Sequence, residues 1–163
     1  MPRTSYVIAL GSNRRHGRHG APANVLRAAL AKLADLGVVE AVSTIRATPA
    51  LGPAGRGFAN AAAILATDLM PDGLLDALKD IERAFGRRSG QRWGPRVLDL
   101  DIILWSEGPW DGPAPTLPHP EFRKRAFVLD PLAEIAPDWR DPITGASVRQ
   151  LRARLTAPRR AHR

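Results

Sequence analysis

Two aspartates, Asp99 and Asp101, interrupt an otherwise apolar run that extends from Val97 to Leu104. Side chains alternate between the two faces of a β-strand, so this spacing predicts both carboxylates on one face and an apolar opposite face made of Leu98, Leu100, Ile102 and Leu104. Two like charges this close on an apolar strand are costly unless a cation lies between them. The alternative is a partly exposed edge strand whose aspartates pair with nearby arginines.

A hard divalent cation suits this pair, because the sequence offers oxygen ligands there and no cysteine or close histidine. A few carboxylates that share an ion with substrate phosphates are typical of Mg²⁺ sites. The segment in front of the strand, Arg92-Trp93-Gly94-Pro95-Arg96, is basic. Guanidinium groups bind phosphate oxygens through two bonds at once. The chain has no Gly-x-x-x-x-Gly-Lys-Ser/Thr loop, so metals and side chains must hold any phosphates.

Length and charge restrict the class of protein. The chain of 163 residues is long enough for one domain, and its formal net charge of +8 favours an anionic partner. We expect a single domain over residues 1–155 and a basic, mobile tail over residues 156–163. No cysteine is present, which excludes disulfides and thiolate metal sites. No signal-peptide pattern and no membrane-spanning apolar run are visible, so we expect a cytoplasmic protein without a membrane partner.

Short strands and helices alternate along the chain. A compact apolar run at Tyr6–Leu10, which ends at Gly11-Ser12-Asn13, predicts the first strand. Helical periodicity that begins near Pro22 and is ended by Gly37 predicts the first helix. Two strands, a second helix and a fourth strand are expected next, at Val38–Thr48, Phe58–Thr67, Pro71–Gly86 and Val97–Trp105.

This β-α-β-β-α-β order is that of a ferredoxin-like α/β sandwich, an α+β fold in which helices pack on one face of an antiparallel sheet. Further helices are expected at the C-terminal end. One is predicted around Pro131–Ile135, and Ser147 with Gln150 fits a capping box in front of a terminal helix.

Several motifs together resemble one enzyme family. They are Gly11-Ser12-Asn13, Thr48-Pro49-Ala50-Leu51-Gly52-Pro53, Phe58-Ala59-Asn60, the stretch from Arg92 to Ile103, and Leu117-Pro118-His119-Pro120 with Arg125-Ala126-Phe127. With these motifs the chain closely resembles the 6-hydroxymethyl-7,8-dihydropterin pyrophosphokinases of the folate pathway, over a span from Tyr6 to Leu155. The Arg92 to Ile103 stretch is the most specific, because both carboxylates and the preceding Trp, Gly, Pro and Arg occur at fixed spacing.

The resemblance implies transfer of an intact pyrophosphoryl group from ATP to the hydroxymethyl group of a reduced pterin, with release of AMP. Asp99 and Asp101 would hold two Mg²⁺ ions and would form the catalytic set together with Arg87, Arg88 and Arg92. The ATP-binding positions of the family fall on Leu75, Arg88, Arg92, Arg96, Ile102, Thr116, His119 and Arg125. No residue is assigned as a general base, because phosphoryl transfer depends mainly on positioning and electrostatics.

The resemblance also implies a pterin pocket. Phe58 and Phe127 match the positions that sandwich the ring, Asn60 the position that bonds its amide edge, and Trp93 the position that covers the closed site. The pocket would further be lined by Thr48, Pro49 and Leu51. Taken without the resemblance, Phe58 and Phe127 are typical core residues, and Asn60 is typical of a buried asparagine that bonds backbone.

One departure from the family pattern keeps an alternative open. Members commonly have Gly-Arg-x-Arg, whereas Arg87 and Arg88 are adjacent here and cannot point as residues i and i+2 do. A catalytically silent nucleotide-binding relative is therefore one alternative. An RNA-binding ferredoxin-like module is another, although the aromatic strand typical of such modules is absent from the sequence. We expect a monomer that binds ATP and reduced pterin and no nucleic acid.

Overall fold

A computed structural model describes residues 2–13, 20–48, 57–86 and 97–157 of the chain. Its elements, in chain order, are β1 Thr4–Ser12, α1 Pro22–Leu33, β2 Val38–Val42, β3 Arg46–Thr48, β4 Phe58–Thr67, α2 Pro71–Gly86, β5 Asp99–Trp105, the 3-10 turn η1 Phe122–Lys124, α3 Ala126–Ile135 and α4 Val148–Thr156. None of the helices in these ranges is long and apolar enough to cross a membrane.

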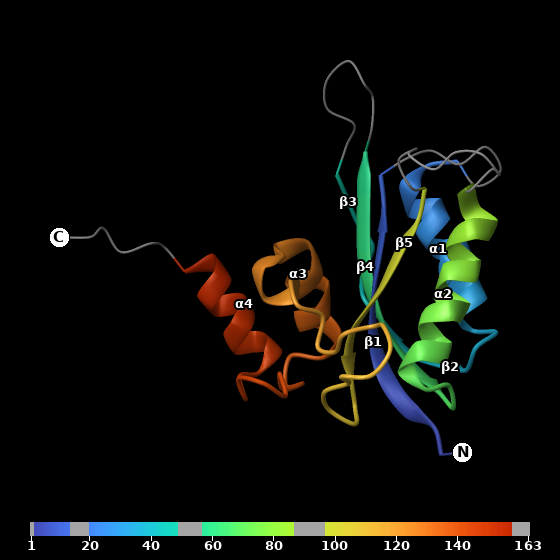
Figure 1. Ribbon diagram of the computed structural model, residues 1–163. Helices are drawn as coiled ribbons and strands as arrows, with labels where there is room; N and C mark the ends of the chain where they lie inside the picture. The colour runs from blue at the N-terminus through green and yellow to red at the C-terminus, as the bar shows by residue number, and fades with distance from the viewer. Residues whose placement is uncertain (1, 14–19, 49–56, 87–96, 158–163) are drawn as a thin grey trace.

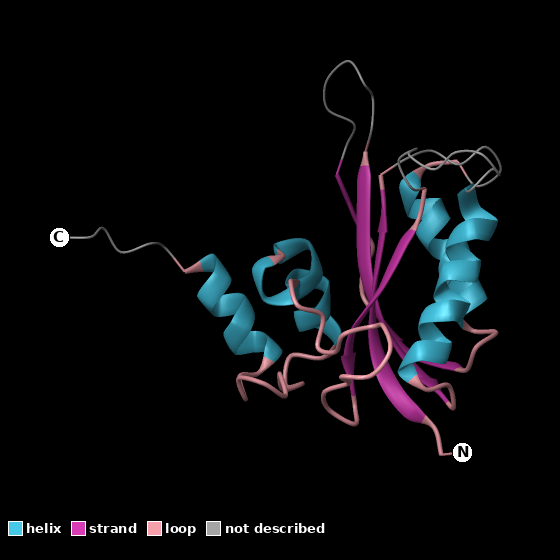
Figure 2. Cartoon of the chain, in the orientation of Figure 1, coloured by secondary structure: helices cyan, strands magenta, loops and turns pink. Residues whose placement is uncertain are grey.

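The strands form one antiparallel sheet in the order β2-β4-β1-β5, and β3 pairs with the first three residues of β4. The predicted ferredoxin-like α+β architecture is confirmed: β1 and β4 lie side by side over their full length, and β5 pairs with the other side of β1 (Figure 2). Because β1 lies between β4 and β5, residues that are far apart in the sequence become neighbours on both faces of the sheet.

The two helices of the β-α-β-β-α-β core cover one face of the sheet, as expected, and the C-terminal helices cover the other face. Figure 1 shows α1 and α2 on one side of the sheet and α3 and α4 on the other. The α1/α2 side holds the larger core, in which Tyr6, Ile8 and Leu10 of β1 are almost completely buried. The α3/α4 side holds a second core around Val7 and Phe122. Because side chains alternate between the two faces of β1, this one strand contributes residues to both cores.

A bulge in β5 changes which face one predicted residue occupies. Val7 pairs with Leu104 and Ile8 pairs with Ile102, so the register shifts at Ile103. Ile103 and Leu104 then both pack in the α3/α4 core, whereas the sequence places Leu104 with Ile102 on the opposite side. An extra residue in one strand shifts the alternation of every later side chain.

The predicted strand Val38–Thr48 is divided into β2 and β3. The backbone N–H of Thr44 donates to Glu134 Oε2 of α3, at 2.5 Å, and not to the neighbouring strand. Ser43 holds the junction, because its Oγ accepts from the Ala62 N–H at 2.9 Å. The edge of the sheet therefore leaves β4 briefly to contact α3 and rejoins it at Arg46.

The ends of two helices also differ from prediction. The first helix ends at Leu33, and Gly37 is required for a different reason: a Cβ there would lie 2.1 Å from the Ala66 carbonyl oxygen of β4. The helix predicted around Pro131 begins at Ala126, with Pro131 inside it. Proline removes one helical hydrogen bond, but the helix is held by buried packing of its apolar side.

A buried ion pair anchors the turn in front of α3. Arg123 of η1 donates to both carboxylate oxygens of Asp141, with Nε 2.5 Å from Oδ2 and an η nitrogen 2.9 Å from Oδ1. Asp141 is fully buried and also accepts from the Ile143 N–H and the Thr144 hydroxyl. The pair therefore ties the segment that follows α3 to the turn that precedes it. The last helix, α4, begins with the predicted Ser147/Gln150 capping box and extends to Thr156, a residue that the sequence analysis places in the tail.

Candidate active site

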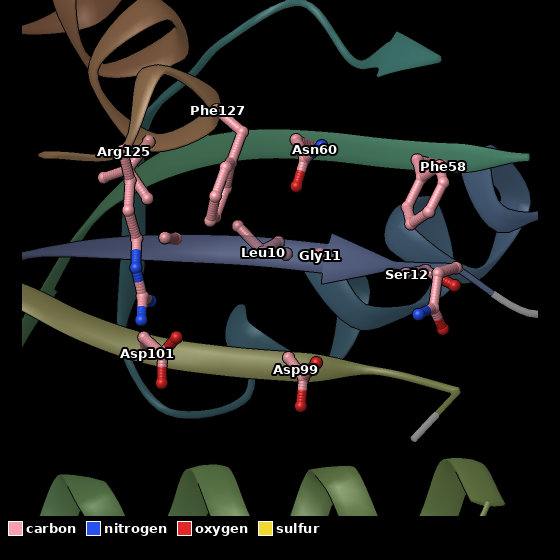
Figure 3. Close-up of a pocket in the computed structure, with 12 residues that line it drawn as sticks. Leu10, Gly11, Ser12, Phe58, Asn60, Asp99, Asp101, Arg125 and Phe127 are labelled. Carbon is pink, nitrogen blue, oxygen red and sulfur yellow. The ribbon is translucent and has the colours of Figure 1, made fainter. Parts of the chain in front are cut away.

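On the α3 side, the helices that the structure describes leave one end of the sheet uncovered (Figure 1). There, three strands contribute one row of neighbouring residues, because Gly11 of β1 pairs with Asn60 of β4 and with Asp99 of β5. In the next row, Ala9 pairs with Asp101. Figure 3 shows the asparagine and the two aspartates on either side of β1, all on the same face of the sheet. The predicted placement of both carboxylates on one strand face agrees with this register.

Small residues in the middle strand make room for a ligand on this face. Ala9 and Gly11 form the floor of a cavity of about 680 Å³, a volume within the ordinary range for small-molecule sites. A Cβ on Gly11 would lie 3.3 Å from Asn60 Oδ1, so a larger residue would press on the neighbouring side chain. The cavity is lined by Ala9, Leu10, Gly11, Ser12, Asn13, Phe58, Asn60, Asp99, Asp101, Arg125, Phe127 and Val128.

Two phenyl rings border the cavity and are far more exposed than core residues. Phe58 at the start of β4 and Phe127 in the first turn of α3 are each 52% exposed. Neither side chain is therefore a core residue. Without the family resemblance, the sequence favours a core position for both rings, and that interpretation is wrong. Flat apolar faces open to a cavity can stack on a planar ring.

Arg125 introduces positive charge beside the carboxylates. It is the N-cap residue of α3, and its carbonyl accepts from the N–H groups of Val128 and Leu129 at 3.0 and 2.9 Å. Its guanidinium carbon lies 5.7 Å from the centre of the Phe127 ring, a cation–π arrangement. Figure 3 shows the side chain extending across the sheet toward Asp101. A cation and two carboxylates thus face the same cavity.

His119 is held just outside this cavity, next to β5. Its backbone N–H donates to the Ile103 carbonyl at 2.9 Å, and its Nδ1 accepts from the Glu121 N–H at 3.1 Å. Burial lowers the pKa of His119 below its usual value; the carboxylate of Asp101 opposes this shift and the Arg125 cation adds to it. The imidazole is thus electrostatically coupled to the charged side of the cavity, with its other nitrogen as the remaining donor site.

The structure does not bring all the predicted site residues together. Ile102 is 3% exposed in the α1/α2 core, and Leu75 packs against the same core. Thr116 is exposed and precedes Leu117, whose backbone pairs with Trp110. None of these three lines the cavity that holds the aspartates. Thr48 pairs through its backbone with Phe58, the first residue of β4.

The other predicted site residues lie outside the described residues; they are Pro49, Leu51, Arg87, Arg88, Arg92, Trp93 and Arg96. Conversely, sequence reasoning assigned no role to Asn13, although it belongs to the Gly11-Ser12-Asn13 motif and lines the cavity. The signal that reveals it is the register of β1, which the sequence does not show.

The two aspartate side chains at this site fit a hard cation that takes its other ligands from water and substrate. In the described ranges, no cluster of three or more His, Cys, Asp or Glu side chains could hold a metal by itself. Two carboxylates on one face, at positions 99 and 101, leave most of a six-oxygen shell to water and substrate oxygens. This sharing is typical of Mg²⁺ in phosphate chemistry, whereas Zn²⁺ sites use nitrogen and sulfur ligands.

One side of the cavity carries charge suited to phosphates and the other carries aromatic rings suited to a flat acceptor. Such a site defines a transferase that brings an anionic donor and a planar ring compound together. Comparison with known proteins makes this specific. A family model described as 7,8-dihydro-6-hydroxymethylpterin-pyrophosphokinase matches residues 7–137. The chain belongs to this family.

Curated relatives agree with the family model. A "2-amino-4-hydroxy-6-hydroxymethyldihydropteridine pyrophosphokinase" of Synechocystis is 41% identical over 147 residues, which cover 89% of this chain and 73% of that protein. A protein of the same name from Pseudomonas aeruginosa is 46% identical over 136 residues, covering 83% of this chain and 82% of the relative.

Solved structures support the fold alone. A structure titled "Crystal Structure Analysis of the HPPK-DHPS in complex with substrates" has a TM-score of 0.72 at 12% identity. The match covers 94% of this chain but only 43% of that longer chain. A Plasmodium falciparum "HPPK-DHPS wild type" structure gives a TM-score of 0.70 at 13% identity, covering 93% of this chain and 41% of the other.

Proposed function

We propose that this chain transfers the pyrophosphoryl group of ATP to the hydroxymethyl group of 6-hydroxymethyl-7,8-dihydropterin, with release of AMP. The observation that carries the proposal is one cavity with paired carboxylates, Asp99 and Asp101, on one side and exposed rings, Phe58 and Phe127, on the other. Membership in the pyrophosphokinase family and the name of the curated relatives support the same reaction.

The acceptor would lie over the small floor of β1. Phe58 and Phe127 would stack on the two faces of the pterin, and Asn60 would bond its amide edge through one donor and one acceptor. With the ring on this side of the floor, its hydroxymethyl substituent would be directed toward β5. The pocket would be completed by Thr48, Pro49, Leu51 and Trp93.

The donor would be held by charge. Asp99 and Asp101 would be the protein ligands of two Mg²⁺ ions. When bound, Mg²⁺ would neutralise charge on the phosphates and align the attacking and leaving oxygens. Arg125 would bind phosphate oxygens from the other side of the cavity, and His119 would contact the nucleotide with the ring nitrogen that does not face Glu121.

The remaining nucleotide contacts belong to residues that the described cavity does not include. They are Leu75, Arg96, Ile102 and Thr116 for ATP binding and Arg87, Arg88 and Arg92 for both binding and stabilisation of transferred charge. We assign no general base, because positioning and charge carry most of phosphoryl transfer. The expectations of a cytoplasmic monomer without a nucleic-acid or membrane partner stay predictions.

The test is to follow the phosphorus products by ³¹P NMR after incubation with ATP and Mg²⁺, with and without 6-hydroxymethyl-7,8-dihydropterin. We expect AMP and a pterin diphosphate in equal amounts, and only in the presence of the pterin. ADP as the product would mean transfer of a single phosphoryl group and would contradict the proposal. Nucleotide binding without any product would favour the catalytically silent relative.

A further inference from the structure

Glu134, near the end of α3, joins this helix to the edge of the sheet. One carboxylate oxygen, Oε2, accepts the backbone N–H of Thr44 at 2.5 Å, and the other, Oε1, lies 3.9 Å from an η nitrogen of Arg46. The hydrogen bond from Thr44 is the main cause that lowers the pKa of Glu134 below its usual value, so the group is a carboxylate at neutral pH. These two contacts, called here the Glu134 tether, hold the start of β3 to α3.

The strand that the Glu134 tether holds lies beside the aromatic side of the cavity. β3 has three residues, and each pairs with one of the first three residues of β4. Those three residues of β4 include Phe58 and Asn60, which line the cavity. Paired strands share backbone hydrogen bonds, so a shift of β3 also shifts the backbone that carries these two side chains.

Apolar packing against α3 stops before it reaches this end of β4. The core on the α3/α4 side includes Ile64 of β4 but, among the described residues, none of residues 58–61. Beyond that core, the small residues Ala9 and Gly11 of β1 form the floor of the cavity. The polar contacts of Glu134 therefore connect α3 to the sheet in the region where the apolar core has ended.

The same helix carries the second ring of the cavity. Phe127 lies in the first turn of α3, and Glu134 follows it by seven residues, which is about two turns of an α-helix. Residues at this spacing lie on the same side of a helix. Figure 3 shows Asn60 between the rings of Phe127 and Phe58. One side of α3 therefore carries both a ring of the cavity and the tether to the strand beside the other ring.

We propose that Glu134 is a positioning residue that holds β3 against α3 and thereby sets the spacing between Phe58 and Phe127. This inference rests on the proposed function, because it takes the compound between the rings to be the pterin. Without the Glu134 tether, the paired ends of β3 and β4 would have to be ordered when the ligand binds, and that ordering lowers affinity. The phosphate side should be unaffected, because Asp99 and Asp101 lie on β5, on the other side of β1.

Three variants separate this role from a general effect on stability. Glu134→Ala removes the tether, whereas Glu134→Gln keeps an acceptor for the Thr44 N–H. Asp130→Ala is the matched control, because Asp130 lies on the same helix and its side chain is 33% exposed against 34% for Glu134. Asp130 accepts from Arg152 of α4 at 2.8 Å, so it tethers α3 to a helix and not to the sheet.

Calorimetric titration measures the affinity of each protein for 6-hydroxymethylpterin, in saturating Mg²⁺ and a non-hydrolysable ATP analogue, and for the ATP analogue alone. We expect Glu134→Ala to bind the pterin about two- to tenfold more weakly than the wild type, the cost of ordering a segment on binding. Glu134→Gln should recover most of this affinity, and Asp130→Ala should match the wild type. Affinity for the ATP analogue should be the same in all four proteins.

Two outcomes of the titrations would overturn the proposal. An equal loss of pterin affinity in Glu134→Gln and Glu134→Ala would mean that the hydrogen bond to Thr44 does not position the site. An equal loss in Asp130→Ala and Glu134→Ala would mean that any weakened support of α3 has the same effect.

Amide hydrogen exchange in the ligand-free proteins tests the Glu134 tether without any substrate. In Glu134→Ala the amides of β3 and of residues 58–60 should exchange faster than in the wild type, whereas those of β5 should be unchanged. Asp130→Ala should leave both regions as they are in the wild type. Unchanged exchange in Glu134→Ala, or unchanged pterin affinity, would overturn the proposal. A wild type that binds the ATP analogue but not the pterin would instead contradict the proposed function.

Discussion

Replacing Phe127 by alanine separates the pterin side of the site from the phosphate side. The ring is 52% exposed in the protein without ligand, so a bound pterin would bury about half of it. Full burial of a phenylalanine is worth about 1.5–3 kcal/mol, so the remaining half contributes about 1 kcal/mol. Stacking adds about 0.5–1.5 kcal/mol. Together these amount to about 1.5–2.5 kcal/mol, or roughly a 10- to 70-fold loss of pterin affinity.

The effect on ATP should be smaller and indirect. Arg125 lies over the Phe127 ring, 5.7 Å from its centre, so the variant loses one support of the proposed phosphate-binding guanidinium. A cation–π contact at such an exposed site is worth about 0.5–1 kcal/mol, so ATP affinity should fall by no more than about fivefold. Phe127→Leu, which keeps apolar bulk without a π face, should lie between the wild type and the alanine variant for both ligands.

Calorimetry with 6-hydroxymethylpterin and a non-hydrolysable ATP analogue measures both affinities directly. Ile143→Ala is the matched control, because Ile143 is also a large exposed apolar residue, 65% exposed, and does not line the cavity. This control should leave both affinities unchanged. Equal weakening of the two ligands by Phe127→Ala would refute the reasoning and return Phe127 to a general role in packing the start of α3.

Two further predictions concern the cavity, and a third concerns the buried Arg123–Asp141 ion pair. Asp99→Asn and Asp101→Asn should each lower turnover by about 10³-fold at saturating ATP and Mg²⁺, because each substitution removes a charge that holds a metal. The unfolding temperature should change little. Near-normal turnover in either variant would contradict the metal assignment. Gly11→Ala should fold and should raise KM for the pterin more than KM for ATP, because the new Cβ would lie 3.3 Å from Asn60 Oδ1. Steady-state kinetics measures both KM values. A larger effect on KM for ATP would contradict the prediction. Burial alone would raise the pKa of Asp141, but its hydrogen bonds hold that pKa well below the usual value, so the stability it contributes is complete above about pH 4 and is lost as the pH falls further. Asp141→Asn should therefore destabilise the protein by about 3–5 kcal/mol at pH 7 in urea unfolding and flatten the acid dependence, whereas an unchanged pH profile would contradict this origin.

Much of the fold is readable from the sequence because local patterns and the tertiary structure agree. Apolar runs, proline at helix starts and the Ser147/Gln150 capping box each predict an element that the structure contains. The errors fall where a distant contact overrides the local pattern. Glu134 of α3 takes the Thr44 N–H away from the sheet, and the bulge at Ile103 moves Leu104 to the other core. Neither the sequence around Thr44 nor the sequence around Ile103 contains a local pattern that predicts these contacts.

The candidate site divides in the same way. Asp99 and Asp101 are readable because two charges at a spacing of two residues conflict with an apolar strand, and such conflicts are typical of functional sites. Phe58 and Phe127 are not readable by themselves, because exposed and buried phenylalanines look alike in a sequence. Asn13 was missed for a related reason: an asparagine after a strand usually indicates a turn, and only the folded structure shows that it lines the cavity.

The shape of the site arises because the side chains on one face of β1 become smaller toward the end of the strand, a pattern called here the taper. On the α1/α2 face this strand presents Tyr6 and Leu10, which are buried throughout. On the other face the side chains shrink from Val7, which packs under α3, through Ala9 to Gly11. Alanine and glycine are compatible with a core, so hydrophobicity alone cannot distinguish this taper from ordinary packing. Its consequence is physical: the sheet remains anchored by a full core on one side, while on the other its own backbone becomes the floor on which a flat substrate can lie.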